Sequence, residues 1–510
     1  METMLDSASN LIGGFGVSLQ PLALIMITIG VVLGLVIGVL PGLGGTAGVA
    51  LLLPLTILVP PEVGIMFLAA IYWGALYGGV ITSILFAIPG EPWSVALIFD
   101  GNPMAKQGKG GLALTTAFMA SFVGIVTAAL LFTIAALPIA RFALRFGPPE
   151  MFAIMLLAFS TFVALGGGSV WKTLVSVTIG LGLTSVGLDI VTGEPRLNFG
   201  SIAFLSGFHF VPVTIGLFGL AEILVHAEER IVKTIEVIPA KMGLKDIRDG
   251  LRAIKDRVGI TAMGSILGFF IGTLPGTGAT PASFLAYGVA KQYSRHPERY
   301  GQGAVEGVIA PQSAADAAGI GSLLPLLTLG IPGSPTAAVL MSALFVYGLF
   351  PGPRLFVEEP EFVWGLISSM FVAATIALAI CLLLTPVLAS IMRVPWGILT
   401  PVIVIACVIG SYVMRNLMLD VWTALAFGVI GYVMKKLNYP LAPLVVALVL
   451  GGMAEEALRQ SLIMGDGSGA IFFSRPISAV IMGIALFLFA LPALRMGAGR
   501  TLALVRNIHT

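Results

Sequence analysis

The first long apolar run of the chain closes on the stretch Gly38-Val39-Leu40-Pro41-Gly42-Leu43-Gly44-Gly45-Thr46. The same order of Gly, Leu, Pro, Gly, Gly and Thr returns in Gly272-Thr273-Leu274-Pro275-Gly276-Thr277-Gly278-Ala279-Thr280. A shorter stretch also occurs twice, as Ile88-Pro89-Gly90-Glu91-Pro92 and as Ile331-Pro332-Gly333-Ser334-Pro335. A Pro-Gly pair removes a backbone donor and loosens a helix, so each stretch predicts a helix break. Because broken backbone in a membrane must be buried in protein or line a polar cavity, the four breaks predict a binding site in the bilayer interior.

The composition indicates a membrane protein. Of the 510 residues, 57% are hydrophobic and only 10% are charged, and the mean hydropathy is +1.03. A soluble globular protein carries about 25% charged residues. The net charge of +2 gives no reason to expect nucleic acid as a partner. We therefore expect an all-α polytopic membrane protein with roughly 10 to 14 membrane elements, including broken helices or re-entrant hairpins.

One long hydrophilic segment divides the chain. It is rich in Lys and Arg, and basic segments stay on the cytoplasmic side of a membrane. We expect an N-terminal segment (1–20), a first membrane half (21–225), the basic cytoplasmic linker (226–258), a second membrane repeat (259–391) and C-terminal membrane helices (392–510).

The charges of matching loops favour inverted repeats. The loop 59–62 has no basic residue, whereas its counterpart 291–299 has three. At the next loop the preference reverses, since 100–111 is basic and 358–361 is acidic. Opposite charge at matching loops indicates opposite orientation in the membrane. The arginines in 141–145 then fall on the outer side, which counts against this topology.

The breaks suit an anionic substrate. Free backbone N–H groups at the start of a half-helix, together with the helix dipole, attract carboxylates. Small residues could also serve only to let helices pack closely, and Ser or Thr could only cap helices. The residues that we expect to bind substrate are Gly42, Gly44, Gly45, Thr46, Gly90, Ser94, Gly276, Thr277, Gly278, Thr280, Gly333, Ser334 and Thr336.

Few charged residues interrupt the apolar runs. Asp316 is the leading candidate for binding a coupling cation, with Gln312 and Ser313 as neutral ligands, because an ionisable residue within a membrane span is a functional candidate. The alternative is a carboxyl group that is hydrogen-bonded within the helix bundle. Glu306 is expected to pair with the basic loop. For Glu91, a helix cap and a direct role remain equally open.

Glu455 and Arg459 are one helical turn apart, so we interpret them as an internal ion pair. The sequence contains no metal-binding or nucleotide-binding motif, and none of its four His residues lies in the breaks. We therefore expect no enzyme activity and no cofactor beyond a possible coupling Na⁺ or H⁺.

Several longer motifs resemble one known family, the large membrane subunits of tripartite tricarboxylate transporters (the TctA family). The motifs are Gly38-Val-Leu-Pro-Gly-Leu-Gly, Tyr77-Gly-Gly-Val-Ile-Thr-Ser-Ile-Leu, Pro89-Gly-Glu-Pro-Trp-Ser-Val-Ala, Asp100-Gly-Asn-Pro, Leu329-Gly-Ile-Pro-Gly-Ser-Pro-Thr-Ala-Ala, Gly352-Pro353, Ala454-Glu-Glu-Ala-Leu-Arg-Gln-Ser and Arg475-Pro-Ile-Ser-Ala. The family usually has Pro-Glu-(Ser/Ala)-Ala-Asn-Asn where this chain reads Pro311-Gln312-Ser313-Ala314-Ala315-Asp316.

The resemblance implies a multi-pass transporter of the bacterial inner (cytoplasmic) membrane. It implies two protein partners, a small membrane subunit (TctB-like) and a periplasmic solute-binding protein (TctC-like). The implied substrate is a tricarboxylate or another small organic carboxylate, imported by cation symport with alternating access.

Three other functions remain open from the sequence. An autonomous carboxylate/cation symporter would use the same broken helices without a binding protein. An intramembrane enzyme would need an activated nucleophile with a base in reach. A passive anion channel would carry flux without a gradient of a coupling ion.

Overall fold

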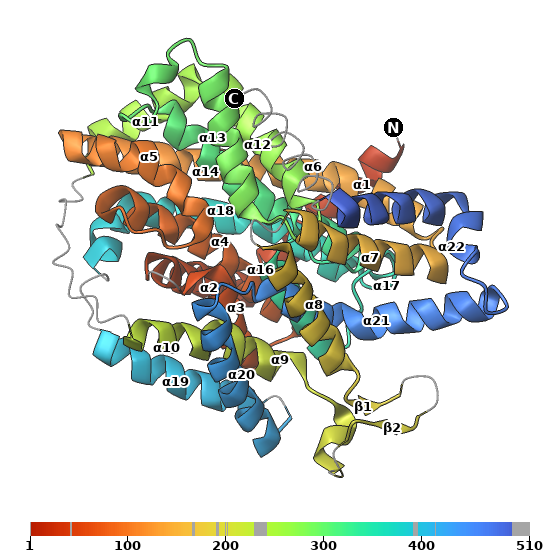
Figure 1. Cartoon of the computed structure of the whole chain (residues 1–510). Helices are drawn as coiled ribbons and strands as arrows, with labels where there is room; N and C mark the ends of the chain where they lie inside the picture. Colours follow the sequence, from red (N-terminus) through yellow and green to blue (C-terminus); the bar gives the residue numbers. More distant parts are fainter. Residues whose placement is uncertain are drawn as a thin grey trace, which may run out of the picture. The chain divides into compact units, whose positions relative to one another are not determined.

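The computed structural model describes residues 2–40, 43–165, 169–189, 193–198, 200, 202–228, 242–390, 396–413 and 415–491. Within these ranges the chain is all-α, and its one sheet is a hairpin of two short strands (Figure 1). Five of the described helices are long and apolar enough to cross a membrane: Pro21–Val39, Pro61–Phe86, Pro92–Ala143, Pro360–Ser390 and Met418–Lys436. The expected all-α polytopic membrane fold is confirmed.

The chain forms two compact units, Met1–Leu144 with Val211–Tyr432, and Arg145–Phe210 with Val433–Thr510. The first unit contains both copies of the Pro-Gly stretches. Its helices before the linker are α1 (Glu2–Ser18), α2 (Pro21–Val39), α3 (Gly44–Leu52), α4 (Pro61–Phe86), α5 (Val95–Met104) and α6 (Gly110–Ala143). Next come α9 (Phe210–Thr214) and α10 (Ala221–Glu228), which runs into the linker, and α11 (Leu244–Asp256), which lies within it. The helices that follow α11 are α12 (Val258–Gly272), α13 (Ala279–Gln292), α14 (Glu306–Gly321), α15 (Leu323–Leu329), α16 (Pro335–Val346), α17 (Leu355–Glu358), α18 (Pro360–Ser390), α19 (Trp396–Val413) and α20 (Met418–Lys436), whose last residues, from Val433, belong to the second unit.

Two helix pairs in the first unit pack through stripes of glycine. On α2, Gly30, Gly34 and Gly38 face the carbonyl oxygens of Phe67, Ile71 and Ala75 on α4. On α12, Gly264, Gly268 and Gly272 face those of Ala310, Ala314 and Ala318 on α14. A Cβ atom at Gly30 would lie 2.6 Å from the Phe67 oxygen, and one at Gly264 would lie 2.8 Å from the Ala310 oxygen. The absence of side chains therefore brings each pair of backbones into direct contact.

The stripes occupy equivalent places in the two halves. Gly38 and Gly272 hold the same position in the duplicated stretch, and so do Gly90 and Gly333 in the shorter one. A Cβ atom at Gly90 would lie 2.6 Å from the Gly38 carbonyl oxygen, and one at Gly333 would lie 2.5 Å from that of Gly272. In each half, the second break therefore packs against the end of the helix that comes before the first break. Gly90 lies against the end of α2, and Gly333 lies against the end of α12.

Asp100 joins the end of α5 to the loop after α13. One carboxylate oxygen of Asp100 accepts hydrogen bonds from the backbone N–H groups of Gly301, Gly303 and Ala304 at 2.8 to 2.9 Å. The other accepts the Tyr287 hydroxyl at 2.9 Å. Nearby, the Gln107 amide donates to the Gln302 carbonyl oxygen at 2.8 Å. Loops from the two halves therefore meet at this end of the unit.

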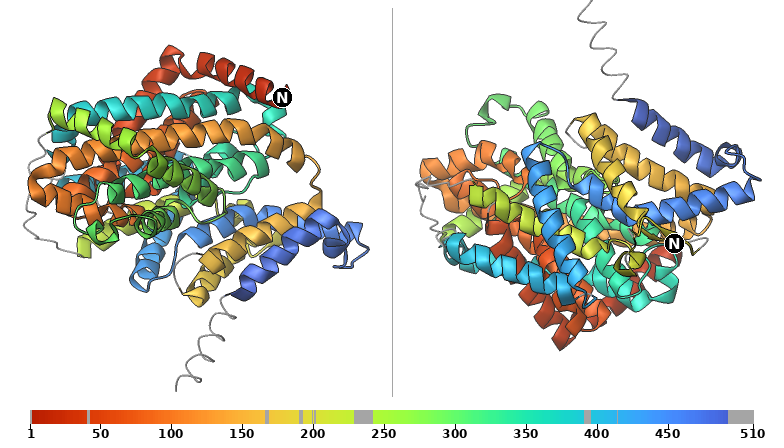
Figure 2. Two further views of the ribbon diagram at one scale, coloured as in Figure 1. Left: turned by 90° about the horizontal axis from the view of Figure 1, so that it is seen from above. Right: turned by 60° about the horizontal axis from the view of Figure 1, so that its bottom comes forward.

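Another pair of loops meets through Tyr347. Its hydroxyl donates to the Thr56 carbonyl oxygen at 2.5 Å, next to the turn that begins α4. The long helix α18 follows this region and packs along α1, α4 and α6 (Figure 2). The loop 59–62 therefore lies near the loop that precedes α18.

The second unit consists of α7 (Pro148–Leu165), α8 (Val170–Thr184), the strands β1 (Gly187–Leu188) and β2 (Pro195–Arg196), α21 (Ala442–Met464), α22 (Ile471–Ser474) and the apolar helix Pro476–Leu491. The helices α7 and α8 pack on α21 (Figure 1). Arg475 forms an ion pair of 2.8 Å with the buried Glu150, which ties the start of the last helix to α7.

Candidate substrate and cation site

Both copies of the longer Pro-Gly stretch interrupt a helix. The first helix of each pair ends near its Pro-Gly pair, at Val39 in α2 and at Gly272 in α12. The next helix begins at Gly44 in one half and after Gly278 in the other. These two glycines have φ angles of +58° and +62°, a conformation that a side chain would strain. Gly42, one of the expected donors, lies outside the described residues.

The shorter stretch also breaks its helix in both halves. The helix α4 ends at Phe86 and is followed by Ala87, whose φ is +54°, and α15 ends at Leu329 and is followed by Gly330, whose φ is +73°. The chain then runs through a non-helical segment before the next helix. In the second half, the Ser334 hydroxyl accepts the Ala337 N–H at 3.1 Å and so caps α16.

The four breaks lie together in the first unit. The hydroxyl oxygens of Thr46 and Thr336 are 2.8 Å apart. The Gly278 N–H donates to the Gly333 carbonyl oxygen at 3.2 Å. The Ser283 hydroxyl, on α13, donates to the Trp93 carbonyl oxygen at 3.0 Å. These contacts bring together stretches that are far apart in the sequence.

The hydroxyl groups near the breaks have different hydrogen-bond acceptors. The Thr277 hydroxyl donates to the carbonyl oxygens of Ile271 and Leu274, so it stabilises its own turn. The Ser94 hydroxyl donates to the Glu91 carbonyl oxygen at 2.7 Å. Thr280 is half-buried in the first turn of α13, and its hydroxyl has no acceptor in the described parts of the chain. Thr280 is therefore the expected donor that is most available to a ligand.

Glu91 caps the first break from across the site. One of its carboxylate oxygens accepts the Gly45 N–H, and the other accepts the Trp93 indole N–H at 3.1 Å. The sequence left a cap and a direct role open for this residue. The structure shows that the side chain reaches the start of α3, a helix that lies 46 positions earlier in the chain.

Tyr72 is a member of the site that sequence reasoning missed. Its ring lies against Gly45, where an added Cβ atom would be 3.0 Å from the ring. Its hydroxyl lies near Gly319 on α14, at 3.3 Å from a Cβ atom built there. The long apolar run of α4 hides this residue, because a Tyr there is equally typical of a membrane-helix core.

Asp316 lies in a second polar cluster, which is completely buried. The Gln312 amide nitrogen donates to an Asp316 carboxylate oxygen and to the Ser121 hydroxyl, both at 2.7 Å. The other Asp316 oxygen, Oδ1, and the Gln312 oxygen Oε1 are buried and have no hydrogen-bond partner. Two buried acceptors without a donor are costly, and a cation or a proton would satisfy them.

The other members of the expected cation site are placed differently. Ser121, on α6, belongs to the cluster, although nothing in its apolar run distinguishes it in the sequence. The Ser313 hydroxyl donates to the Ala310 carbonyl oxygen at 3.2 Å and lies against Gly264. Glu306 forms an ion pair of 2.5 Å with Arg257 of the basic linker, so its predicted pairing with the basic loop 291–299 is wrong.

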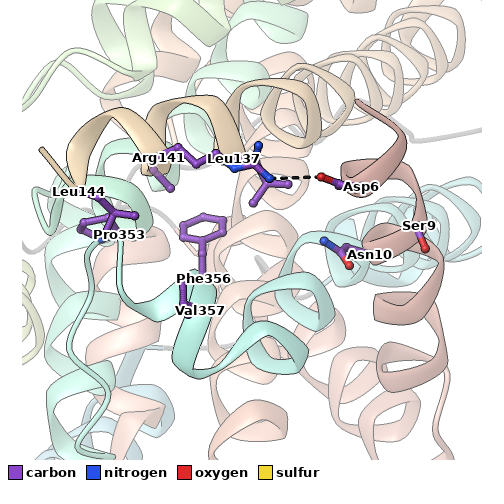
Figure 3. A pocket seen from close by; sticks show the side chains of 10 residues that line it. Asp6, Ser9, Asn10, Leu137, Arg141, Leu144, Pro353, Phe356 and Val357 are labelled. Atoms are coloured by element: carbon purple, nitrogen blue, oxygen red, sulfur yellow. Dashed lines mark hydrogen bonds and ion pairs between the residues drawn. The ribbon is translucent and has the colours of Figure 1, made fainter. Parts of the chain in front are cut away.

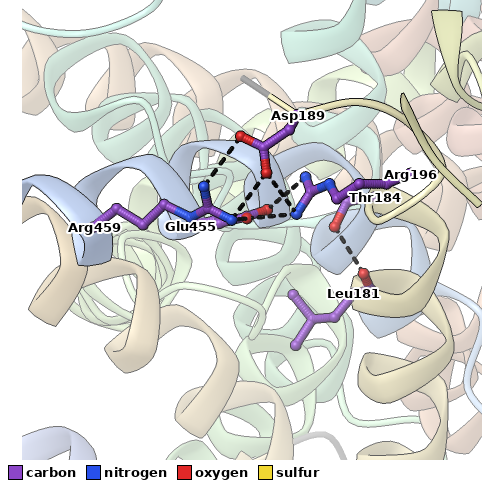
Figure 4. A network of polar contacts seen from close by, with 6 residues as sticks. All are labelled: Leu181, Thr184, Asp189, Arg196, Glu455 and Arg459. Atoms are coloured by element: carbon purple, nitrogen blue, oxygen red, sulfur yellow. Dashed lines mark hydrogen bonds and ion pairs between the residues drawn. The ribbon is translucent and has the colours of Figure 1, made fainter. Parts of the chain in front are cut away.

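A network of charges holds the strand hairpin of the second unit (Figure 4). Arg459 contacts Glu455 at 2.7 Å, so the expected ion pair within α21 is confirmed. Arg459 also contacts Asp189 at 3.0 Å, and Arg196 on β2 contacts Glu455 at 2.8 Å. The hydrogen bond to Glu455 raises the pKa of Arg196. The motif around Glu455 therefore anchors the hairpin of the second unit.

One pocket of about 410 Å³ lies elsewhere in the first unit. Asp6, Ser9 and Asn10 of α1 face Leu137 and Arg141 of α6 across it (Figure 3). Arg141 and Asp6 form an exposed ion pair of 3.2 Å. The pocket lining includes none of the residues expected to bind substrate.

Comparisons with known proteins agree with the motifs. The family model "Tripartite tricarboxylate transporter TctA family" matches residues 24–446. An Agrobacterium vitis protein named "Uncharacterized 52.8 kDa protein in TAR-I ttuC' 3'region" is 38% identical over 483 residues, which cover 95% of each chain. A second protein of that organism, named for the "TAR-II ttuC' 3'region", is 38% identical over 231 residues, 45% of this chain and 96% of its own. No solved structure matches the chain. The chain belongs to the tripartite tricarboxylate transporter TctA family.

Proposed function

We propose that the chain is the large membrane subunit of a secondary transporter that imports a tricarboxylate or another small organic carboxylate. The observation that carries this proposal is the meeting of the four helix breaks, where Thr46 and Thr336 are in hydrogen-bond contact. Helix starts converge there and supply N–H groups and hydroxyls without a permanent positive charge. Such uncharged donors bind a carboxylate and can release it again.

The expected substrate residues divide into direct and supporting groups. The backbone at Gly44, Gly45, Gly276, Gly278, Gly90 and Gly333, with Gly42, would line the site, and the hydroxyls of Thr46, Thr280 and Thr336 would contact the anion. The N–H groups of Gly45, Gly278 and Gly333 are bonded within the protein, so each would have to exchange its present partner for the anion. Thr277, Ser94 and Ser334 would hold the turns in shape, because their hydroxyls bond to the backbone of their own segments.

Coupling to a cation gradient would use the buried cluster around Asp316. The unpartnered oxygens of this cluster are Asp316 Oδ1 and Gln312 Oε1, and Ser121 binds the Gln312 amide nitrogen. Both α6 and α14 pack against the helices that form the breaks. A Na⁺ or H⁺ bound there would compensate the buried carboxylate. Movement of the cation and the substrate would then depend on each other.

Alternating access would use the two halves as inverted repeats. The matched glycine stripes support a repeat, because equivalent glycines make equivalent contacts. The contacts between loops support the inversion, since Gln107 meets Gln302 and Tyr347 meets Thr56. Parallel repeats would instead place loops at equivalent positions, such as 59–62 and 291–299, at the same end.

The family name supports assembly with partner subunits. We propose a small TctB-like membrane subunit, a periplasmic TctC-like binding protein and residence in a bacterial inner membrane. The alternative is an autonomous carboxylate/cation symporter, which the same breaks would serve.

Uptake of labelled citrate into proteoliposomes tests the proposal. We expect saturable uptake that requires a Na⁺ or H⁺ gradient and the binding protein. Thr280→Val should raise the KM about tenfold, because a hydrogen bond to a charged group is worth about 1.5–3 kcal/mol. Thr277→Val is the matched control, since its hydroxyl stabilises its own turn and its loss should lower the melting temperature instead. Uptake without the binding protein would favour the autonomous symporter, and gradient-independent flux would favour a channel.

A further inference from the structure

The N–H groups at the helix starts have different hydrogen-bond partners in the two halves of the site. In the first half, the Glu91 carboxylate fills the start of α3 by accepting the Gly45 N–H. Its second oxygen accepts the Trp93 indole N–H. Both oxygens of Glu91 thus act as hydrogen-bond acceptors. Glu91 therefore occupies one of the places that a substrate carboxylate would take under the proposed function.

The second half has no equivalent carboxylate. Ser334 stands where Glu91 stands in the first half, and its hydroxyl caps its own helix α16 and contacts Ser322 at 3.0 Å. The start of α13 is left with the half-buried Thr280, and no described side chain accepts a hydrogen bond from its first-turn N–H groups. At the start of α13 the Gly278 N–H is bonded to the Gly333 carbonyl oxygen, but the Ala279 and Thr280 N–H groups and the Thr280 hydroxyl have no acceptor among the described residues. The Ala279 N–H, the counterpart of the Gly45 N–H, is therefore open, while the Gly45 N–H is filled.

A second position beside Glu91 also differs between the two halves of the chain. A Cβ atom on Gly44 would lie 3.0 to 3.2 Å from Glu91 side-chain atoms, and one on Gly45 would lie 3.3 Å from its oxygen Oε1. Contacts below 3.4 Å are tight, so side chains there would crowd the carboxylate. The counterpart of Gly45 in the second half is Ala279, which carries a Cβ atom. The half that lacks the carboxylate thus carries a methyl group where the first half has only a hydrogen atom beside Glu91.

We propose that Glu91 is a tethered surrogate for one carboxylate of the substrate. In the substrate-free protein it satisfies the donors at the start of α3. An incoming di- or tricarboxylate binds the open start of α13 with one carboxylate and displaces Glu91 with another. This inference rests on the proposed function, because it assigns the two donor sets to the same anion.

Glu91 should make the site prefer anions with at least two carboxylates. A monocarboxylate can occupy the second-half donors alone, but it cannot reach across to replace Glu91. A substrate with at least two carboxylates gains both sets of donors, less the free energy needed to displace the side chain. Glu91 therefore lowers the affinity for every anion that must displace it, and it keeps the first-half donors paired when no substrate is bound.

Binding of citrate to the full chain in lipid nanodiscs tests this role. We expect Glu91→Ala to bind citrate about tenfold more tightly than the unaltered protein, because the competing internal occupant is gone. Glu91→Gln keeps the shape and one acceptor oxygen without the charge, and should show an intermediate affinity. Glu62→Ala, at the start of α4, is the control for removing a carboxylate outside the site.

Chemical rescue separates the surrogate from a merely structural side chain. Glu91→Ala should melt at a lower temperature without anion, and millimolar formate should restore the melting temperature by filling the vacated place. Formate should leave the melting temperature of the unaltered protein unchanged. Citrate affinity that is unchanged or weaker in a folded Glu91→Ala protein would overturn the inference while the proposed function stands. A failure of the unaltered protein to bind any carboxylate would instead overturn the proposed function.

Discussion

Thr46 and Thr336 are 290 positions apart in the sequence, and their hydroxyl oxygens are 2.8 Å apart in the structure. Thr46 stands in the first turn of α3, and Thr336 stands in the first turn of α16. The contact joins the first break of one half to the second break of the other. It is therefore a direct hydrogen bond between the two halves at the proposed site.

The effects of removing these two hydroxyls on the free energy of unfolding should not be additive. Thr46→Val and Thr336→Val should each lower the free energy of unfolding by about 1 kcal/mol, since each loses one hydrogen bond. The double variant should cost less than the sum, because the second substitution finds no partner left to remove. Thermal unfolding in detergent measures all three variants. Simple additivity would show that the two hydroxyls are not paired in the ground state.

The glycine stripes should be intolerant of side chains. Gly272→Val would place atoms against the Ala318 carbonyl group, and we expect it to lower the free energy of unfolding by about 1–3 kcal/mol or to prevent folding. Gly288→Val on α13 is the matched control, because a Cβ atom there would have no neighbour within 4 Å. Melting temperatures of purified protein compare the two, and equal effects would contradict the close contact of α12 with α14.

Neutralising Asp316 should change the coupling. Asp316→Asn removes the carboxylate whose Oδ1 atom lacks a partner, so uptake should lose its dependence on the Na⁺ or H⁺ gradient. We expect the rate of concentrative uptake to fall by about tenfold or more, which corresponds to about 1.4 kcal/mol. Ser313→Ala removes a nearby hydroxyl that bonds to the backbone instead, and it should keep the ion dependence. An unchanged response of Asp316→Asn to Na⁺ and pH would remove this residue from coupling.

Inverted repeats predict the sides on which four loops are labelled. Single cysteines at Lys106 and Arg295 should react with an impermeant maleimide from the cytoplasmic side, and those at Pro60 and Glu359 from the other side. All four positions are exposed, while the native Cys381 and Cys407 are buried and should give a low background. Labelling of Pro60 and Arg295 from the same side would exclude the inversion.

The amino-acid order by itself determined the class of the fold and the location of the helix breaks. Low charge and long apolar runs require a membrane environment, since about 20 apolar residues span its core. The Pro-Gly pairs break helices for local reasons, because proline lacks an N–H group and glycine permits positive φ angles, as at Gly278. These helix breaks depend only on the residues at the break, so the sequence is sufficient to predict them.

Only the tertiary structure decided which groups meet. The contact of Glu91 with Gly45, the inclusion of Tyr72 in the site and the pairing of Ser121 with Gln312 all join different helices. A membrane helix exposes a similar apolar pattern on every face, so its sequence does not indicate which face turns toward a neighbour. Side-chain partners across helices depend on that rotation, which the packing of glycine against backbone carbonyl groups sets in this protein.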